Sequence, residues 1–311
     1  MPFEDLPEEA RRHAAYPRAE RPARRRRIDA HGVGISVAEW GDEAAPPILL
    51  AHGGFDFAAT FSVFAPLLAR AGHRVVAFDQ RGHGDSDHTA LYSWGADLRD
   101  TLAVLDSITR EPIPLIGHSK GGSLLTQFAQ AHPHRVSHLV NIDGMPSRGR
   151  RPDVSDHERS RLLDRELQGW LDHRRATTDR RRRSGGLEEL AKRRGRMNPR
   201  LDHAWLCFLV TQGARLDEDG WRWKIDPTMR FGGFGPWNPN WELQRLPGLS
   251  PPLLGLLAMI PEEMGWETRE KDLVPYLPRH AQIVSFEQSG HFVHIEFPDE
   301  VARLVLEFIR R

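Results

Sequence analysis

The sequence of 311 residues has one cysteine, Cys207, so it can form no internal disulfide, and a cysteine-rich zinc site is not expected. It has no apolar run near the roughly 20 residues that cross a bilayer. Basic and acidic side chains balance at 43 each, which gives no overall attraction to nucleic acid or a membrane surface. These absences predict a cytoplasmic protein with neither of those partners.

The first 27 residues are rich in Arg, Glu, Ala and Pro and contain no apolar run. They match neither a secretory signal nor a membrane anchor, and we expect residues 1–27 to form a flexible arm. The run of four arginines at 24–27 is interpreted as a solvated edge. The remaining length suits one large α/β core with an insertion.

Short apolar runs at 47–51 and 74–78 have the form of buried parallel strands, and each ends in a tight turn. The first turn reads H-G-G-F at 52–55. The second, at 79–87, reads D-Q-R-G-H-G-D-S-D and is dense in the residues that tight turns favour. A tight turn is therefore predicted after each of the two strands.

The pentapeptide G-H-S-K-G at 117–121 lies between an apolar strand end at 114–116 and a helix start at 122–125. A serine in this setting is the nucleophile elbow, in which glycines on either side permit a sharp, strained turn. Ser119 is therefore predicted to be presented for attack.

Near the C-terminus, residues 282–286 form a predicted strand and residues 299–310 a predicted helix. The turn between them, S-G-H-F at 289–292, carries His291. This histidine is a candidate general base, whereas His294, three positions on, is expected to face the start of the helix.

In this order, the H-G-x loop, the D-x-R-G-x-G-x-S turn and the G-x-S-x-G elbow resemble the alpha/beta-hydrolase superfamily. The resemblance implies a mostly parallel central sheet with flanking helices, and a loop histidine, here His291, as general base. It also implies an oxyanion hole formed by the backbone N–H groups of Gly54 and Lys120.

The acid that should orient His291 has two possible positions. The usual family position follows the strand predicted at 252–258 and offers Glu262 or Glu263. The other is Asp143, after the strand predicted at 137–142, where some relatives place their acid. We favour Glu262, with Asp143 close behind, although carboxylates at 262–263 would also suit the first turn of a helix.

Residues 145–249 interrupt the rhythm of strands and turns and are predicted to form a lid inserted into a core of residues 28–144 and 250–311. Apolar residues recur there at helical spacing, namely Leu162, Leu163, Leu167, Trp170 and Leu171. The arginine run at 180–183 is interpreted as a solvated loop, with attraction of an anionic substrate as the lesser alternative.

Aromatic side chains gather later in this segment. The stretch D-G-W-R-W-K-I-D-P at 219–227 resembles the lid of serine-hydrolase-like members of the superfamily. The aromatic residues would either line an apolar pocket or form a core of the lid itself; they are Trp221, Trp223, Phe231, Phe234, Trp237 and Trp241.

The predicted function is hydrolysis of an ester or related acyl bond of a small, partly apolar substrate through an acyl-enzyme, with no metal or cofactor. Serine at position 119 argues against epoxide hydrolases and haloalkane dehalogenases, which use an aspartate at the elbow. Esterases, C–C bond hydrolases and cofactor-free haloperoxidases stay open. The alternative from another class is a non-catalytic protein that binds a small ligand on the same fold. The oligomeric state is left open.

Overall fold

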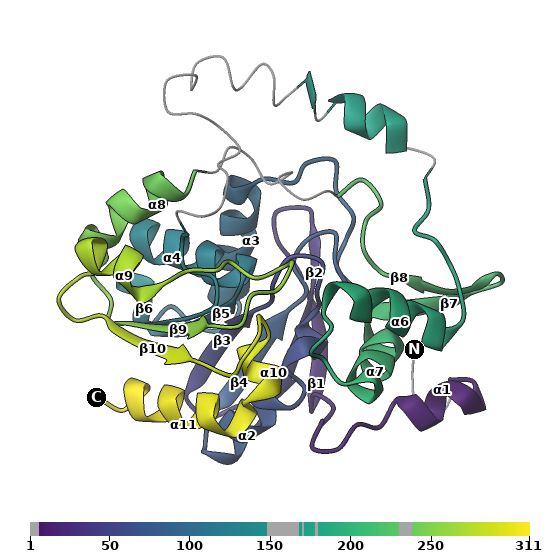
Figure 1. Ribbon diagram of the computed structural model, residues 1–311, viewed down its shortest axis with the longest axis horizontal. Coiled ribbons are helices and arrows are strands. Elements are labelled where there is room, and N and C mark those ends of the chain that lie inside the picture. The colour runs from purple at the N-terminus through teal and green to yellow at the C-terminus, as the bar shows by residue number, and fades with distance from the viewer. Residues whose placement is uncertain (1–5, 148–167, 170, 178–179, 230–237) are drawn as a thin grey trace.

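The computed structural model describes residues 6–147, 168–169, 171–177, 180–229 and 238–311 (Figure 1). Within these ranges eight strands form one sheet in the order β1-β2-β4-β3-β5-β6-β9-β10. Their bounds are β1 Arg24–Asp29, β2 Gly34–Trp40, β3 Pro47–Ala51, β4 Arg74–Phe78, β5 Ile113–His118, β6 Val136–Ile142, β9 Leu253–Ala258 and β10 Gln282–Phe286. Strands β4, β3, β5, β6, β9 and β10 pair in parallel, and β1 and β2 are antiparallel to their neighbours.

Apolar side chains fill both faces of this sheet, as expected for parallel strands. On β3, Leu49 belongs to one core cluster, whereas Ile48 and Leu50 belong to the other. This alternation follows from the two-residue period of a strand. Helices must therefore cover both faces.

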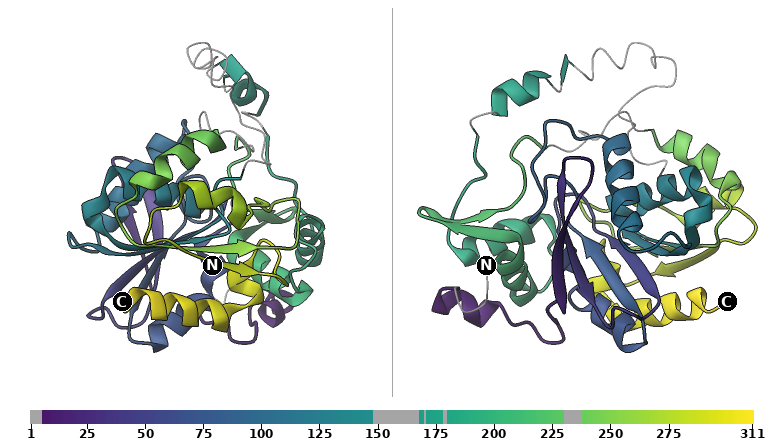
Figure 2. Two further views of the ribbon diagram at one scale, coloured as in Figure 1. Left: turned by 60° about the vertical axis from the view of Figure 1, so that its left-hand side comes forward. Right: turned by 180° about the vertical axis from the view of Figure 1, so that it is seen from behind.

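Helices lie on both sides of the sheet (Figure 2). The cluster containing Leu49 includes side chains of α3, α4, α8 and α9, and the opposite cluster includes those of α2 and α11. Helix α11 starts with Pro298 followed by two acidic residues, which suit the first turn of a helix. The helix bounds are α1 Glu8–His13, α2 Phe64–Arg70, α3 Trp94–Asp106, α4 Lys120–Ala131, α6 Leu187–Met197, α7 His203–Gly213, α8 Pro239–Arg245, α9 Glu270–Leu273, α10 Val293–Glu296 and α11 Pro298–Ile309.

The N-terminal segment differs from the flexible arm expected over 1–27. Helix α1 and the residues on either side of it bury Leu6, Ala10 and Ala14 in a cluster with α7, and β1 adds a strand to the sheet edge. The arm was expected because its apolar residues are few and small. They are nevertheless enough to dock a short helix on Trp205, the large buried residue of that cluster.

The predicted lid is described only in part. Residues 162, 163, 167, 170, 231, 234 and 237, to which the sequence analysis assigned apolar roles, lie outside the described ranges. Helices α6 and α7 and the hairpin of β7 (Ala214–Asp217) and β8 (Gly220–Trp223) are described. Trp221 is buried in the cluster of α6 and α7, and the Trp223 ring stacks on Phe57 at 5.7 Å between centroids. The division into core and lid stays a prediction.

The sheet order brings two loops together. Strand β4 lies on one side of β3 and β5 on the other, so β3 and β5 flank the point where the chain reverses direction across the sheet. Ala51 at the end of β3 pairs with Gly117 near the end of β5. Ligands of open α/β sheets bind at such a point, beyond the carboxyl ends of the strands.

The arginine run that begins β1 is held by one buried acid. The carboxylate of Glu39 on β2, 1% exposed, lies 3.0 Å from Arg24, 2.6 Å from Arg26 and 2.9 Å from Arg74. Although burial alone would raise it, the hydrogen bonds from Arg74 and Arg26 lower the pKa of Glu39 to about 2. Alternate arginines of the run thus face this carboxylate, and only the others form the solvated edge that was expected.

We predict that Glu39→Gln lowers the free energy of unfolding at pH 7 by roughly 3–5 kcal/mol, the range for breaking a buried ion pair. The folded-state pKa lies below the usual 4.5, so the stabilisation is present above pH 4.5 and disappears as the pH falls toward about 2. Urea unfolding of the wild-type and Glu39→Gln proteins between pH 7 and 3 measures this difference in the free energy of unfolding.

The matched control is Glu43→Gln, because Glu43 also contacts Arg24 but its side chain is 67% exposed. This control should change stability by less than about 1 kcal/mol. Equal effects of the two variants, or a Glu39→Gln effect that does not decline with acid, would contradict this account.

Candidate active site

Ser119 lies between β5 and α4 with φ 53° and ψ −123°, a backbone conformation that non-glycine residues rarely adopt. Its flanking glycines are required by close packing: a Cβ on Gly117 would lie 2.3 Å from the Gly121 carbonyl oxygen, and one on Gly121 would lie 2.2 Å from that of Ala51. The strained strand-to-helix turn expected from the sequence is therefore present.

His291 and Asp143 form a buried pair. The Nδ1 atom of His291 lies 2.6 Å from Oδ2 of Asp143, and both side chains are 1% exposed. The other oxygen, Oδ1, accepts a hydrogen bond from the Ala258 backbone N–H at 3.1 Å. Asp143 follows β6 with φ 44°. This carboxylate is therefore fixed against the imidazole ring.

The favoured acid, Glu262, does not reach the ring of His291. Its Oε2 atom accepts a hydrogen bond from the His291 backbone N–H at 2.6 Å, and Glu263 is exposed. The preference for Glu262 is therefore corrected in favour of Asp143 as the partner of the ring. Because β6 and β9 are neighbours, both carboxylates arrive beside the His291 loop, and only their directions distinguish them.

A tryptophan that the sequence analysis did not single out contacts the nucleophile. The Trp266 indole donates a hydrogen bond from Nε1 to Ser119 Oγ at 3.1 Å. Within the described ranges no hydrogen bond joins Ser119 Oγ to the ring of His291. Trp266 lies in the irregular segment after β9, where no periodic pattern marks it in the sequence.

The loop at 52–55 passes beside the elbow. A Cβ on Gly53 would lie 3.1 Å from Ser119 Cβ, and one on Gly54 would lie 3.8 Å from the Lys120 side chain. Phe55 has φ 58°, and its backbone N–H donates to His83 Nε2 at 3.1 Å. The two residues expected to form the oxyanion hole, Gly54 and Lys120, are thus neighbours.

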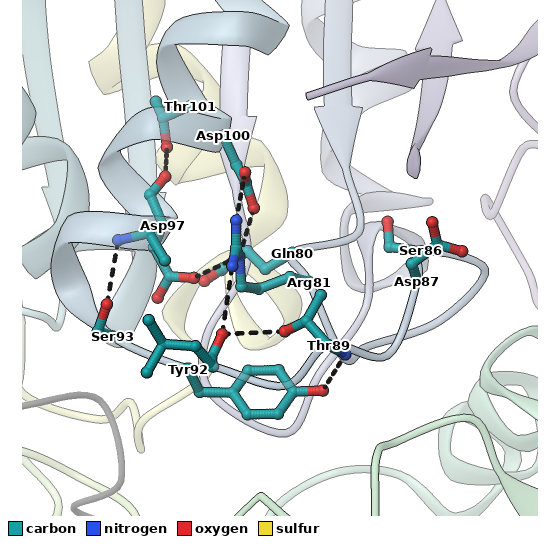
Figure 3. A network of polar contacts seen from close by, with 12 residues as sticks. Gln80, Arg81, Ser86, Asp87, Thr89, Tyr92, Ser93, Asp97, Asp100 and Thr101 are labelled. Carbon is teal, nitrogen blue, oxygen red and sulfur yellow. Dashed lines mark hydrogen bonds and ion pairs between the residues drawn. The ribbon is translucent and has the colours of Figure 1, made fainter. Parts of the chain in front are cut away.

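The side chain of Lys120 is turned into the protein. Its Nζ atom donates to Gln80 at 2.6 Å and to Asp97 at 2.7 Å. Arg81 makes two hydrogen bonds of 2.6 Å to Asp100 and lies 3.9 Å from Asp97 (Figure 3). Two cations and two carboxylates therefore balance in a buried network that fixes the first residue of α4.

Four buried histidines surround the elbow and the loop at 52–55. Burial lowers the pKa of His52 and of His294 to about 3, and it holds those of His83 and His118 well below the ordinary value. The ring of His118 lies 4.7 Å from that of His291, and its Nε2 donates to the His291 carbonyl oxygen at 2.9 Å. These imidazoles are neutral hydrogen-bonding groups near pH 7.

Within the described part of the chain, no group of three His, Cys, Asp or Glu side chains is placed to hold a metal ion. No helix of that part is long and apolar enough to cross a bilayer.

The buried histidines predict a loss of stability in mild acid. Below about pH 6.5 the unfolded chain binds protons on these imidazoles while the folded protein does not, so the free energy of unfolding declines toward pH 3. We expect His294→Gln to reduce the slope of the urea midpoint between pH 7.5 and 5. His134→Gln, at an exposed position, should leave the slope unchanged, and parallel curves for all three proteins would refute the account.

Comparison with known proteins bears on the fold. The alpha/beta hydrolase fold family matches residues 46–184. The sn-1-specific diacylglycerol lipase ABHD11 of Mus musculus is 36% identical over 107 residues, which are 34% of this chain and 35% of that protein. Epoxide hydrolase A of Mycobacterium tuberculosis is 33% identical over 120 residues, 38% of this chain and 37% of that protein. Such matches span about a third of the length of these curated relatives.

Similarity to solved structures extends over most of the chain. The thioesterase domain from the curacin biosynthetic pathway superposes with a TM-score of 0.76 at 23% identity, covering 91% of this chain and 99% of that domain. At this identity the likeness concerns the fold. Together with the elbow, the family match and the sheet order, it shows that the chain has the alpha/beta-hydrolase fold.

Proposed function

We propose that this protein is a serine hydrolase that cleaves an ester or related acyl bond of a small molecule through Ser119, His291 and Asp143. The observation that carries the proposal is the buried His291–Asp143 pair, 2.6 Å apart, in the same site as a serine on a strained turn. A protein that only bound a ligand would need neither the strain nor the pair.

The pair determines which ring nitrogen is available for catalysis. With Nδ1–H donating to Asp143, Nε2 of His291 carries a lone pair and accepts the proton of Ser119 as Oγ attacks the carbonyl carbon. Catalytic hydrogen bonds often form only in the substrate complex, so the Ser119 hydroxyl would direct its hydrogen to Nε2 there while Oγ still accepts from the Trp266 indole. His291 then protonates the leaving group, and water hydrolyses the acyl-enzyme.

Negative charge on the substrate carbonyl oxygen would be stabilised by the backbone N–H groups of Gly54 and Lys120. Lys120 is the first residue of α4, a helix of 12 residues whose N-terminus carries partial positive charge. Because these donors belong to the main chain, they are positioned before the reaction starts.

The nucleophile separates this proposal from one of the relatives. Epoxide hydrolases use an aspartate at the elbow, whereas this chain has Ser119. The similarity to a diacylglycerol lipase agrees with an ester substrate. C–C bond hydrolases and cofactor-free haloperoxidases would use the same triad.

The first test is labelling by a fluorophosphonate, followed by mass spectrometry of the modified peptide. We expect wild-type protein to be labelled at Ser119 and Ser119→Ala to be unlabelled. His291→Ala should slow labelling by roughly a thousandfold or more, and Asp143→Asn by roughly a hundredfold or more, because the ring loses its base or its correct tautomer.

Glu262→Gln is the matched control for the acid, since it changes a buried carboxylate that contacts the same residue through the main chain. It should retain labelling within about tenfold, because the glutamine carbonyl oxygen can still accept the hydrogen bond from the His291 N–H, and a neutral bond in its place contributes roughly 1 kcal/mol. Loss of labelling in Glu262→Gln with normal labelling of Asp143→Asn would return the acid to Glu262. Absence of labelling in folded wild-type protein would favour a binding protein.

A second prediction concerns Trp266. Its indole N–H donates to Ser119 Oγ, so the hydroxyl keeps its own hydrogen free for His291. Trp266→Phe removes one neutral hydrogen bond and should lower kcat/KM for p-nitrophenyl hexanoate roughly tenfold without changing Tm. A rate that rises instead would mean that the indole holds the serine in a resting orientation.

A further inference from the structure

A cavity of about 400 Å³ lies beside the loop that carries Gly54, and its lining is both cationic and apolar. The lining residues are Phe55, Met197, Trp223, Ile225, Met229, Arg182, Arg183, Arg193 and Arg194. Among the described residues of the lining there is no carboxylate, although the chain as a whole carries equal numbers of basic and acidic side chains.

Arg194 connects this cavity to the candidate active site. Its Nη1 atom donates to the carbonyl oxygen of Phe55 at 2.9 Å, immediately after the predicted oxyanion loop. Its guanidinium also lies 5.9 Å from the ring centre of Phe292, the residue that follows His291. The cavity wall therefore touches both the oxyanion loop and the histidine loop.

The guanidinium of Arg194 is buried, and two of its nitrogen atoms have no hydrogen-bond partner in the described part of the chain. Arg194 is 8% exposed, and within the described ranges its Nε and Nη2 atoms have no hydrogen-bond acceptor. A buried donor without a partner costs roughly 1–3 kcal/mol, so such an atom in a native protein needs an explanation. An anionic oxygen group would supply acceptors with the geometry that a guanidinium prefers.

The carboxylate of Asp56 does not satisfy these donors. Asp56 is buried and influences Arg194 through its charge, yet the Nε and Nη2 atoms of Arg194 make no hydrogen bond to it. Burial raises the pKa of Asp56 and so favours its neutral form. Asp56 is not part of the cavity lining.

Two of the other three arginines, Arg182 and Arg193, are anchored to carbonyl oxygens. Arg182 donates to the carbonyl of Asp226 at 2.8 Å and lies 5.8 Å from the ring centre of Phe55. Arg193 donates to the carbonyl of Ser184 at 2.9 Å. Backbone carbonyls position these cations without neutralising them, so the run at 180–183 is only partly the solvated loop that was expected.

Two further acids act on the group. Glu189 lies 3.4 Å from Arg183 and 3.7 Å from Arg193, and its side chain is 48% exposed. Asp226 acts on Arg182 through its charge. These carboxylates offset the four arginines only in part, because exposed ion pairs contribute little. The apolar lining, which includes Trp223 and Met229, suits a hydrocarbon chain or ring.

We infer that this cavity receives an anionic oxygen group, a carboxylate or a phosphate-type oxyanion, carried on an apolar part of the substrate. The inference rests on the proposed acyl hydrolysis and adds its substrate class: an ester with a negative charge several bonds from the bond that is cleaved. Arg194 is the principal recognition residue, and Arg183 contributes long-range attraction.

The test compares three p-nitrophenyl esters whose acyl chains have similar length and differ in the terminal group: the hexanoate, the adipate monoester and the 5-phosphonopentanoate. We expect kcat/KM to be roughly 10–100-fold higher for one or both anionic esters than for the hexanoate, the value of a charge-assisted hydrogen bond. The better of the two anionic esters identifies the oxyanion. Preference should weaken with added salt, because the exposed part of the attraction is screened.

The variants are Arg194→Gln, Arg183→Gln and, as a matched control, Arg196→Gln, which changes an exposed arginine of the same helix outside the cavity lining. The readout is the ratio of kcat/KM for the anionic ester to that for the hexanoate, which cancels any general loss from disturbing Phe55. The ratio should fall to near one in Arg194→Gln, fall about threefold in Arg183→Gln and stay unchanged in Arg196→Gln.

A ratio near one in wild-type protein that hydrolyses all three esters would overturn the inference and leave the proposed function standing. If no ester is hydrolysed, the proposed function fails, and calorimetric titration of Ser119→Ala protein with adipate decides the inference separately. Binding that Arg194→Gln abolishes would support an anion site, and absence of binding would overturn it.

Discussion

The site depends on one backbone constraint, the left-handed conformation of Ser119 between a buried strand and a helix. A strained residue persists only where its surroundings hold it. Here the Ser119 N–H donates to the Ile142 carbonyl oxygen at 2.8 Å, and a Cβ on Gly144 would lie 2.1 Å from the Ser119 carbonyl oxygen. The close approach of β5, α4 and the loop after β6 therefore stabilises the turn, and glycine is needed where the backbones touch.

Desolvation is the second influence on the site. The imidazoles of His52, His83, His118 and His294 are buried and neutral, so they act as fixed hydrogen-bonding groups for the loops around the nucleophile. Asp143 contacts the ring of His291, whereas Glu262 contacts only its main chain. Two carboxylates thus have separate tasks: one orients the imidazole and the other holds the loop that carries it.

Arginine-rich stretches of similar composition have different surroundings. Alternate arginines of β1 point to a single buried acid, Glu39, and form part of the stable sheet edge. Arg182 and Arg193 bond to carbonyl oxygens and, with Arg183 and Arg194, line a cavity whose described lining residues include no carboxylate. Net charge near zero conceals this difference, because neutrality of the whole chain says nothing about where unlike charges meet.

The sequence by itself determined the parts of the protein that local chemistry dictates. Glycine spacing around Ser119, the apolar strands and the turn before the last helix predicted the fold, the elbow and the position of His291. Only the tertiary structure decided which acid meets the ring, because Asp143 and Glu262 follow neighbouring strands and differ in direction rather than in local pattern. The same holds for Trp266, for the docking of α1 and for the partners of each arginine. These depend on contacts between residues far apart in the chain, which no spacing of residues encodes.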